Sequence, residues 1–313
     1  MATRHLVDPE LLPLLEMMPP TDLAAMDLGE LRVASNARYA FLGAPAIAPV
    51  VHTIAGPDGS LEVYLYDPAP GTPARPALLH IHGGGMIMGS ASVMQAGPAA
   101  MAQSLGIPVA SVEYRLAPEH PFPAPQEDCL AALNWLVSLP QVDADRVGVI
   151  GESAGGGLAA SVALMARDLG GPKLAAQFLT YPMLDHRTGG DDCRYNNPTT
   201  GEFIWTRASN RFGWGALKGG YEPIDERKGW FSPSLAEDLS GLPPTWIGTG
   251  SLDLFYDEDL DYARRLVAAG VAVELHSYPG AIHAFNAVAG SRLAQAFGRD
   301  LMGAIAQWLK VAA

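Results

Sequence analysis

Cysteine is scarce in this chain. Among 313 residues there are two cysteines, Cys129 and Cys193, and they form no CxxC motif. A fold held together by disulfides is therefore excluded, and neither a thiolate metal site nor any other metal site is expected. Both cysteines are interpreted as small buried hydrophobic residues.

Positive charge is also scarce. Lys and Arg number 20 against 33 Asp and Glu, which gives a formal net charge of −13. An acidic surface repels phosphate backbones and anionic lipid headgroups. Neither nucleic acid nor a membrane surface is therefore expected as a stable partner.

Long apolar runs are missing as well. The stretch from Pro76 to Val112 has no Asp, Glu, Lys or Arg, but two histidines, three consecutive glycines and Pro98 interrupt it. It does not make the apolar span of about 20 residues that a transmembrane helix needs. Near the N-terminus, Asp8, Glu10 and Glu16 interrupt every apolar run, which argues against a signal peptide. A cytoplasmic location is the resulting expectation.

From Ala77 onward, strand-like and helix-like segments alternate. The strand candidates are short and mostly apolar at both odd and even positions, as expected of strands buried on two faces. This alternation predicts an α/β fold with a mainly parallel central sheet and helices on both faces. The strand candidates are residues 77–81, 108–112, 147–150, 175–180, 245–249 and 271–278, and the helix candidates are residues 91–104, 126–139, 154–168, 257–269 and 290–309.

Three parts are distinguished along the chain. Residues 1–45 are predicted to be helical, with Thr21 capping a helix that runs to Tyr39. Residues 46–183 and 241–313 are predicted to form the α/β core, which begins with a hairpin of strands at 50–54 and 61–66. Residues 184–240 lack a clear strand, and we interpret them as an insertion that joins residues 1–45 in a cap.

One segment has the pattern of a catalytic serine. Gly151-Glu152-Ser153-Ala154-Gly155 fits G-x-S-x-G, directly after an apolar strand candidate and directly before a helix candidate. This is the context of a nucleophile elbow, in which the serine occupies a strained turn flanked by glycines. Ser153 is therefore the candidate nucleophile, and the helix start beyond it offers free N–H groups to an oxyanion. The alternative is a glycine-rich turn with a structural serine.

A second segment is rich in unshielded backbone amides. His82-Gly83-Gly84-Gly85 follows the strand candidate 77–81, and consecutive glycines leave N–H groups free to stabilise a tetrahedral oxyanion. We interpret His82 as a structural residue that holds this loop. The rival interpretation is a metal pair formed by His80 and His82, but no third ligand lies at metal-site spacing.

A serine nucleophile needs a general base. The chain order serine, acid, histidine leaves three candidates, His186, His276 and His283. His283 is favoured because it lies in the loop after strand candidate 271–278, at the sheet edge where catalytic residues collect. His186 falls in the irregular insertion, and His276 falls inside a strand pattern.

The base needs an acid that orients it and offsets its developing charge. Asp253 stands just after strand candidate 245–249 and is the predicted acid. Asp257 suits the N-cap of the following helix better, and Asp185 follows an earlier strand and would fit a different topology.

Together these segments resemble the hormone-sensitive-lipase-like (bacterial family IV) esterases of the α/β-hydrolase fold. The resemblance covers about residues 50–310 in the family's order. It implies that Ser153 is the nucleophile, His283 the base and then the acid, and Asp253 the orienting acid. It also implies that the oxyanion hole consists of backbone amides from Gly84, Gly85 and Ala154. The matching segments are His82–Gly85, Glu113–Ala124, Gly151–Gly156, Tyr181-Pro182, Leu252–Leu254 with Asp257, and Tyr278–Gly280 with His283 and Phe285.

The chain departs from the family's pattern near the glycines. Met86 follows them where the family usually has an aromatic residue, and Met88 is close behind. Met86, Met88 and Glu152 are expected to bind substrate, and flexible methionine side chains leave the pocket shape open. The other departures are Ala284 after His283 and Glu113 before Tyr114.

The segment after Glu113 is expected to be architectural. Arg115 and Glu119 stand beside prolines that fix a turn, and we interpret them as a structural pair rather than as substrate contacts.

The predicted activity is that of a serine carboxylesterase acting on short- to medium-chain acyl esters through an acyl-enzyme intermediate. A small-molecule ester is the expected substrate, and no cofactor is expected. An amidase, or a deacetylase acting on a small molecule or sugar, uses the same machinery and stays open. A non-catalytic ligand-binding protein predicts a broken triad, whereas all three residues are present. The resemblance also favours a homodimer through an edge strand, with residues 271–278 as the candidate.

Overall fold

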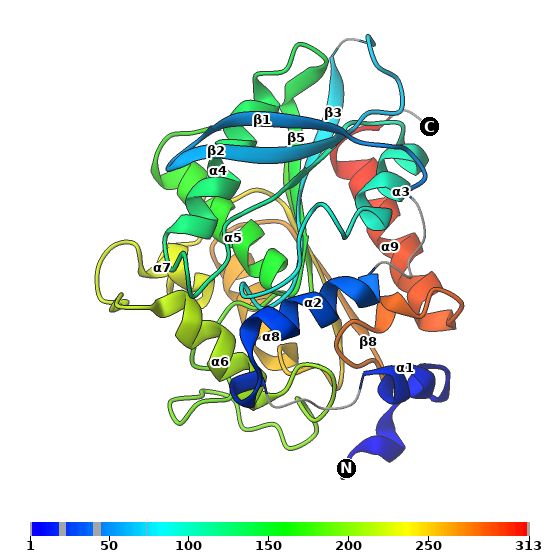
Figure 1. Cartoon of the computed structure of the whole chain (residues 1–313), viewed down its shortest axis with the longest axis vertical. Helices are drawn as coiled ribbons and strands as arrows, with labels where there is room; N and C mark the ends of the chain where they lie inside the picture. The colour runs from blue at the N-terminus through cyan, green and yellow to red at the C-terminus, as the bar shows by residue number, and fades with distance from the viewer. Residues whose placement is uncertain (1, 19–22, 40–44, 73, 312–313) are drawn as a thin grey trace.

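The computed structural model describes residues 2–18, 23–39, 45–72 and 74–311. These residues form one eight-stranded sheet and the helices that pack against it (Figure 1). The strand order is β1-β2-β4-β3-β5-β6-β7-β8. β1 pairs antiparallel with β2 and β2 antiparallel with β4, whereas every other pairing is parallel. The predicted α/β fold with a mainly parallel sheet is confirmed. The strands are β1 (Val50–Gly56), β2 (Gly59–Tyr66), β3 (Arg75–Ile81), β4 (Val109–Val112), β5 (Val142–Glu152), β6 (Ala176–Thr180), β7 (Thr245–Gly250) and β8 (Val273–Tyr278).

Helices cover the sheet on both faces. Figure 1 shows α3 and α9 on one side of the strands and α4 and α5 on the other. No helix in the described ranges is long and apolar enough to span a lipid bilayer. The helices are α1 (Leu12–Met17), α2 (Leu28–Tyr39), α3 (Ala96–Leu105), α4 (Ala124–Val137), α5 (Ala154–Asp168), α6 (Arg207–Lys218), α7 (Lys228–Phe231), α8 (Tyr256–Ala268) and α9 (Arg292–Trp308).

The central strands are apolar at both odd and even positions, because the two sets of side chains face different helical layers. Successive side chains of a strand point to opposite faces of the sheet. Leu79 of β3 packs in the cluster that includes the buried residues of α4 and α5, whereas Leu78 packs with the buried residues of α3 and α9. Both leucines are fully buried. The position of the strand within the sheet thus accounts for its unbroken apolar sequence.

β8 differs from this pattern. It is an edge strand, and its side chains alternate between partly buried and exposed, with Leu275 exposed. The expectation that this strand is buried on two faces is wrong, whereas the expectation that residues 271–278 contain an edge strand is confirmed. β7 is its one neighbour within the described sheet, so its other edge has no strand partner there, and Leu275 and Ser277 are exposed.

The predicted N-terminal helix is divided in two. A short 3₁₀ turn at Leu23–Ala25 precedes α2, which begins at Leu28. The helix begins here because the Asp27 carboxylate accepts a hydrogen bond from the Glu30 amide at 3.0 Å, which caps the first turn. The predicted cap Thr21 lies outside the described residues.

Arg115 and Glu119 do not pair with each other. Arg115, directly after β4, binds Asp128 of α4, and its guanidinium also reaches Asp58 at 3.3 Å. Glu119 instead accepts two hydrogen bonds from Arg32 of α2. The predicted pair is wrong because each residue finds a partner from a distant segment, which spacing along the chain does not reveal.

The Arg115–Asp128 contact predicts a measurable share of the stability. The buried Asp128 carboxylate accepts from the backbone N–H, Nε and Nη2 of Arg115, each at 2.9 Å. Asp128→Ala leaves these donors without an acceptor, so the free energy of unfolding in urea should fall by about 3 kcal/mol. Asp58→Ala removes the exposed partner of the same arginine and should cost less than about 1 kcal/mol. Equal losses in the two variants would contradict this account.

Candidate active site

Ser153 lies in a strained turn between β5 and α5. Its backbone has φ 57° and ψ −120°, a region that residues with a side chain rarely adopt. Hydrogen bonds hold it there: the Ser153 N–H donates to the Thr180 carbonyl at 2.9 Å, and the Ser153 carbonyl accepts from Gly157 and Met183. The turn is thus fixed by β6 and α5 together.

The two glycines of the G-x-S-x-G segment are required by close backbone contacts. A Cβ added at Gly155 would lie 2.0 Å from the Ile81 carbonyl oxygen, and one added at Gly151 would lie 2.2 Å from the Gly155 carbonyl oxygen. No side chain fits at such distances. Glycine therefore allows α5 to begin directly against the ends of β3 and β5.

Three predicted residues meet at this turn. His283 Nε2 lies 2.9 Å from Ser153 Oγ, and His283 Nδ1 lies 2.8 Å from Asp253 Oδ2. Ser153, Asp253 and His283 follow β5, β7 and β8, whose carboxyl ends share one edge of the sheet. The second Asp253 oxygen accepts from the Phe255 N–H at 3.0 Å, which fixes the carboxylate. All three side chains are buried.

The rejected histidine candidates lie in other surroundings. His276 Nε2 is 2.7 Å from Glu274 on the edge strand β8. His186 packs its ring against Phe231 in the 184–240 segment. Neither histidine is hydrogen-bonded to Ser153.

The rejected acids have other partners too. Asp185 forms an ion pair with Arg187 at 2.7 Å. Asp257 is the second residue of α8 and lies in its acidic first turn, while the N-terminal position before the helix is Phe255. The expectation that Asp257 is the N-cap of this helix is therefore wrong, because Asp257 lies inside the first turn.

The glycine loop lies beside Ser153. A Cβ added at Gly83 would lie 3.5 Å from Ser153 Cβ, so the two backbones are in close contact. Gly84 and Gly85 have φ values of 121° and 62°, which favour glycine. Their N–H groups donate no hydrogen bond to a described residue. Ala154 is the first residue of α5, where helix N–H groups have no partner within the helix.

The residues predicted to bind substrate have distinct surroundings. Met86 is buried, has φ 65°, and accepts a hydrogen bond from the Ala117 N–H. Met88 is partly buried at the edge of the core cluster. The Glu152 carboxylate is turned to His80, with Oε2 3.3 Å from Nε2. His80 Nδ1 in turn lies 2.9 Å from Ser111 Oγ.

His82 is fixed inside the loop that it begins. Its ring stacks on Tyr114 with centroids 4.2 Å apart, and its Nδ1 lies 2.8 Å from the Gly83 carbonyl oxygen. Burial lowers the pKa of His82 to about 4, so the ring is neutral near pH 7. Among the described residues, no group of three or more His, Cys, Asp or Glu is arranged to hold a metal ion.

Aromatic rings enclose His283. The rings of Tyr181, Phe255 and Trp205 have centroids 4.8, 5.4 and 6.5 Å from the imidazole centroid. Phe255 and Trp205 are not among the site residues predicted from the sequence. Phe255 follows the predicted acid by two positions, which is a usable signal, whereas Trp205 lies in a segment without regular periodicity.

The comparison with known protein families agrees with this geometry. A family model described as the alpha/beta hydrolase fold matches residues 78–287, from β3 to the residues just after His283. The chain belongs to the alpha/beta hydrolase fold family.

Relatives within the alpha/beta hydrolase family are esterases by name. Carboxylesterase NlhH of Mycobacterium tuberculosis is 35% identical in an alignment that covers 94% of each chain. Ethyl acetate hydrolase of Pseudomonas putida is 35% identical over 234 residues, 72% of this chain and 71% of that protein. The solved structure of a bacterial heroin esterase superposes with a TM-score of 0.88 at 36% identity and covers 99% of both chains. The resemblance to the hormone-sensitive-lipase-like esterases is confirmed.

The lowered pKa of His82 predicts a pH dependence of stability for this hydrolase. The folded chain protonates His82 below about pH 4, whereas an unfolded histidine is protonated below about pH 6.5. Between these values the unfolded chain holds more protons, so acid destabilises the fold by about 2 kcal/mol between pH 7 and pH 5 through this residue.

His82→Asn keeps a donor for the Gly83 carbonyl and removes the titrating ring. Urea unfolding at pH 7 and pH 5 should therefore show a smaller loss of stability in the variant, by about 2 kcal/mol. The remaining titrating groups are common to both proteins and cancel in the comparison. Identical losses in the two proteins would show that His82 is not held neutral by burial.

Proposed function

We propose that this chain is a serine carboxylesterase that hydrolyses short- to medium-chain acyl esters of small molecules through an acyl-enzyme intermediate. The chain is a carboxylic ester hydrolase, like the relatives named above. The observation that carries the proposal is the continuous chain of hydrogen bonds from Ser153 Oγ through His283 to Asp253, with lengths of 2.9 and 2.8 Å.

In the proposed acylation step, His283 Nε2 accepts the proton of Ser153 Oγ while this oxygen attacks the ester carbonyl carbon. The Asp253 carboxylate accepts from Nδ1–H, which selects the tautomer with a free Nε2 and stabilises the imidazolium that forms. His283 then protonates the leaving alcohol, and the acyl group remains on Ser153. The apolar rings around His283 keep water from competing for its proton.

In the proposed deacylation step, a water molecule replaces the alcohol. His283 accepts a proton from this water, which attacks the acyl carbon, and the same proton then returns to Ser153 Oγ as the acid leaves. No proton is gained or lost by the enzyme over the cycle. One histidine therefore serves both steps.

Both steps pass through a tetrahedral oxyanion. We assign its stabilisation to the backbone N–H groups of Gly84, Gly85 and Ala154, because the first two lie beside Ser153 without a described acceptor and the third begins α5. Each such donor contributes about 3 kcal/mol in the transition state. The lowered pKa of His82 keeps a neutral ring at the start of this loop.

The cap remains part of the proposal. Figure 1 shows α1, α2 and α6 in the lower half of the molecule, away from the hairpin of β1 and β2. Thr3 donates to Glu202, and Arg32 of α2 donates to the Ile87 carbonyl just beyond the glycine loop. These contacts support a cap made of residues 1–45 and 184–240, with residues 46–183 and 241–313 as the core. The homodimer and the cytoplasmic location stay predictions.

Ester hydrolysis that depends on Ser153 is the direct test. Wild-type protein should hydrolyse p-nitrophenyl esters from acetate to laurate with the highest kcat/KM at short to medium chains. Ser153→Ala removes the nucleophile, so kcat should fall by roughly 10⁶. An unchanged thermal midpoint would show that the variant is folded. The absence of turnover in the wild type, or turnover that survives in the variant, would overturn the proposal.

Two aspartates separated by four positions provide a matched comparison. Asp253→Asn keeps the size of the side chain but removes the charge that faces His283, so kcat should fall by roughly 10⁴. Asp257→Asn changes the same residue type in the first turn of α8 and should leave kcat within about threefold. Steady-state kinetics on one p-nitrophenyl ester measures both. A larger effect at Asp257 would reverse the assignment of the acid.

A further inference from the structure

Within residues 184–240, the ring of Trp205 contacts the glycine loop and also lies near the proposed base. A Cβ added at Gly85 would lie 2.2 Å from Trp205 Cη2, so the indole occupies the space where a side chain would stand. Its ring centroid is 6.5 Å from that of His283. The side chain is buried. A substrate group that extends along the oxyanion loop therefore meets this ring.

The orientation of the indole is fixed by a buried amide. Trp205 Nε1 donates to Asn210 Oδ1 at 3.1 Å, and Asn210 Nδ2 donates to the Thr188 carbonyl at 2.7 Å. Asn210 lies on α6 and is fully buried. Its two functional groups thus link the indole to the beginning of the same segment.

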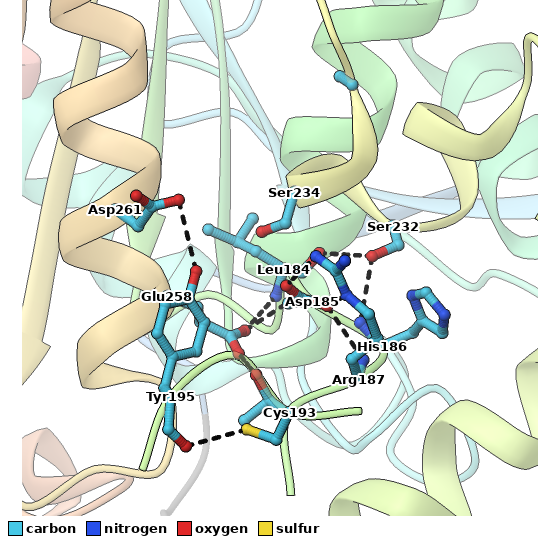
Figure 2. Close-up of polar contacts among 12 residues, drawn as sticks. Leu184, Asp185, His186, Arg187, Cys193, Tyr195, Ser232, Ser234, Glu258 and Asp261 are labelled. Atoms are coloured by element: carbon cyan, nitrogen blue, oxygen red, sulfur yellow. Dashed lines mark hydrogen bonds and ion pairs between the residues drawn. The ribbon is translucent and has the colours of Figure 1, made fainter. Parts of the chain in front are cut away.

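The beginning of the segment is anchored to the core by Glu258. Figure 2 shows this side chain of α8 turned toward the backbone of Leu184 and Asp185. Its Oε1 accepts from their N–H groups at 2.7 and 3.1 Å, and its Oε2 is hydrogen-bonded to the Thr188 hydroxyl. Glu258 is fully buried, and it follows Asp253 by five positions. The helix that begins beside the proposed acid therefore also holds the segment that carries Trp205.

We propose that Trp205 sets the size of the substrate group accepted beside the oxyanion loop, and that Asn210, Thr188 and Glu258 are positioning residues that hold the indole there. The proposal rests on the proposed function and deepens it, since it names the residue that limits the ester. Burial raises the pKa of Glu258 well above its usual range, which favours the protonated carboxyl. A glutamine at this position resembles the protonated carboxyl, because it is uncharged and has nearly the same shape.

The primary test replaces the indole with a smaller side chain. Trp205→Leu opens space beside Gly85, so the ratio of kcat/KM for a bulky ester to that for p-nitrophenyl acetate should rise about tenfold or more. Two series are measured: acyl groups from acetate to laurate, and acetates of p-nitrophenol and of larger naphthols. A rise in either series supports the proposal, whereas unchanged ratios in both series overturn it.

Trp214→Leu is the matched control. Trp214 is a buried tryptophan of the same segment, on α6, and its ring packs against those of His186 and Phe231. Loss of this indole should leave the substrate ratios unchanged even if it lowers the thermal midpoint. A partly unfolded sample lowers the apparent kcat/KM for the bulky ester and for p-nitrophenyl acetate by the same factor. The ratio of the two values therefore reports selectivity and not stability. An equal rise in both leucine variants would attribute the effect to general loosening and overturn the role of Trp205.

The hydrogen bond to Asn210 is tested by a double-mutant cycle. Asn210→Ala frees the indole and should raise the same ratio by about threefold in the wild-type background. Trp205→Phe keeps a ring but has no indole N–H, so Asn210→Ala should have no further effect in that background. If Asn210→Ala changes the ratio equally in both backgrounds, Asn210 does not act through the indole and is not a positioning residue.

The anchor on α8 is tested by conservative and disruptive changes. Glu258→Gln should keep the wild-type ratio, whereas Glu258→Ala should raise it in the direction of Trp205→Leu. Thr188→Val removes the hydroxyl that is hydrogen-bonded to Glu258 and keeps nearly the same volume. It therefore tests the Thr188–Glu258 contact even if Glu258→Ala does not fold. A wild-type ratio in Thr188→Val and in folded Glu258→Ala would remove these residues from the proposal.

Failure of this inference and failure of the proposed function give different results. If the wild type does not hydrolyse esters, or if hydrolysis survives Ser153→Ala, the proposed function fails and this inference fails with it. If hydrolysis depends on Ser153 but the ratios of Trp205→Leu equal those of the wild type, the esterase assignment stands and the role of Trp205 alone is overturned.

Discussion

The backbone of Ser153 is the constraint on which the rest of the site depends. A left-handed φ at a residue with a side chain costs about 1–3 kcal/mol, and it persists only where the surroundings impose it. Here the Ser153 N–H donates to the carbonyl of Thr180 in β6, and the Ser153 carbonyl accepts from residues of α5 and from Met183. The close contact of Gly155 with the Ile81 carbonyl leaves no room for the backbone to take another conformation. The large apolar core on both faces of the sheet supplies the stability that keeps this turn in place.

The sheet brings together residues that are far apart in the chain. Asp253 and His283 lie 100 and 130 positions beyond Ser153, yet parallel pairing from β5 to β8 sets their loops along one edge. Each loop needs only to reach its neighbour, because the register of the strands has already fixed the distances between them. Local sequence therefore determines which residues stand at the edge, and sheet topology determines which of them meet.

This division explains what could be predicted from the sequence. The α5 helix has the predicted bounds, because a strand, a glycine-flanked serine and an apolar helix follow one another without a gap. Ser153 directly follows β5, and Asp253 and His283 lie in the loops after β7 and β8, so position along the chain singled them out as candidates. The break before α2 was missed because it depends on one capping aspartate. The partners of Arg115 and Glu119, and the position of Trp205, depend on contacts between distant segments, which no local pattern encodes.

The position of His283 in the chain also governs when chemistry can begin during synthesis. The segments of the nucleophile turn and the glycine loop are made before the proposed base, which belongs to the last strand–loop unit and is followed by α9. A single domain generally folds as a unit. An interrupted product that ends before β8 therefore lacks the proposed base together with the strand and helix, β8 and α9, that complete the domain.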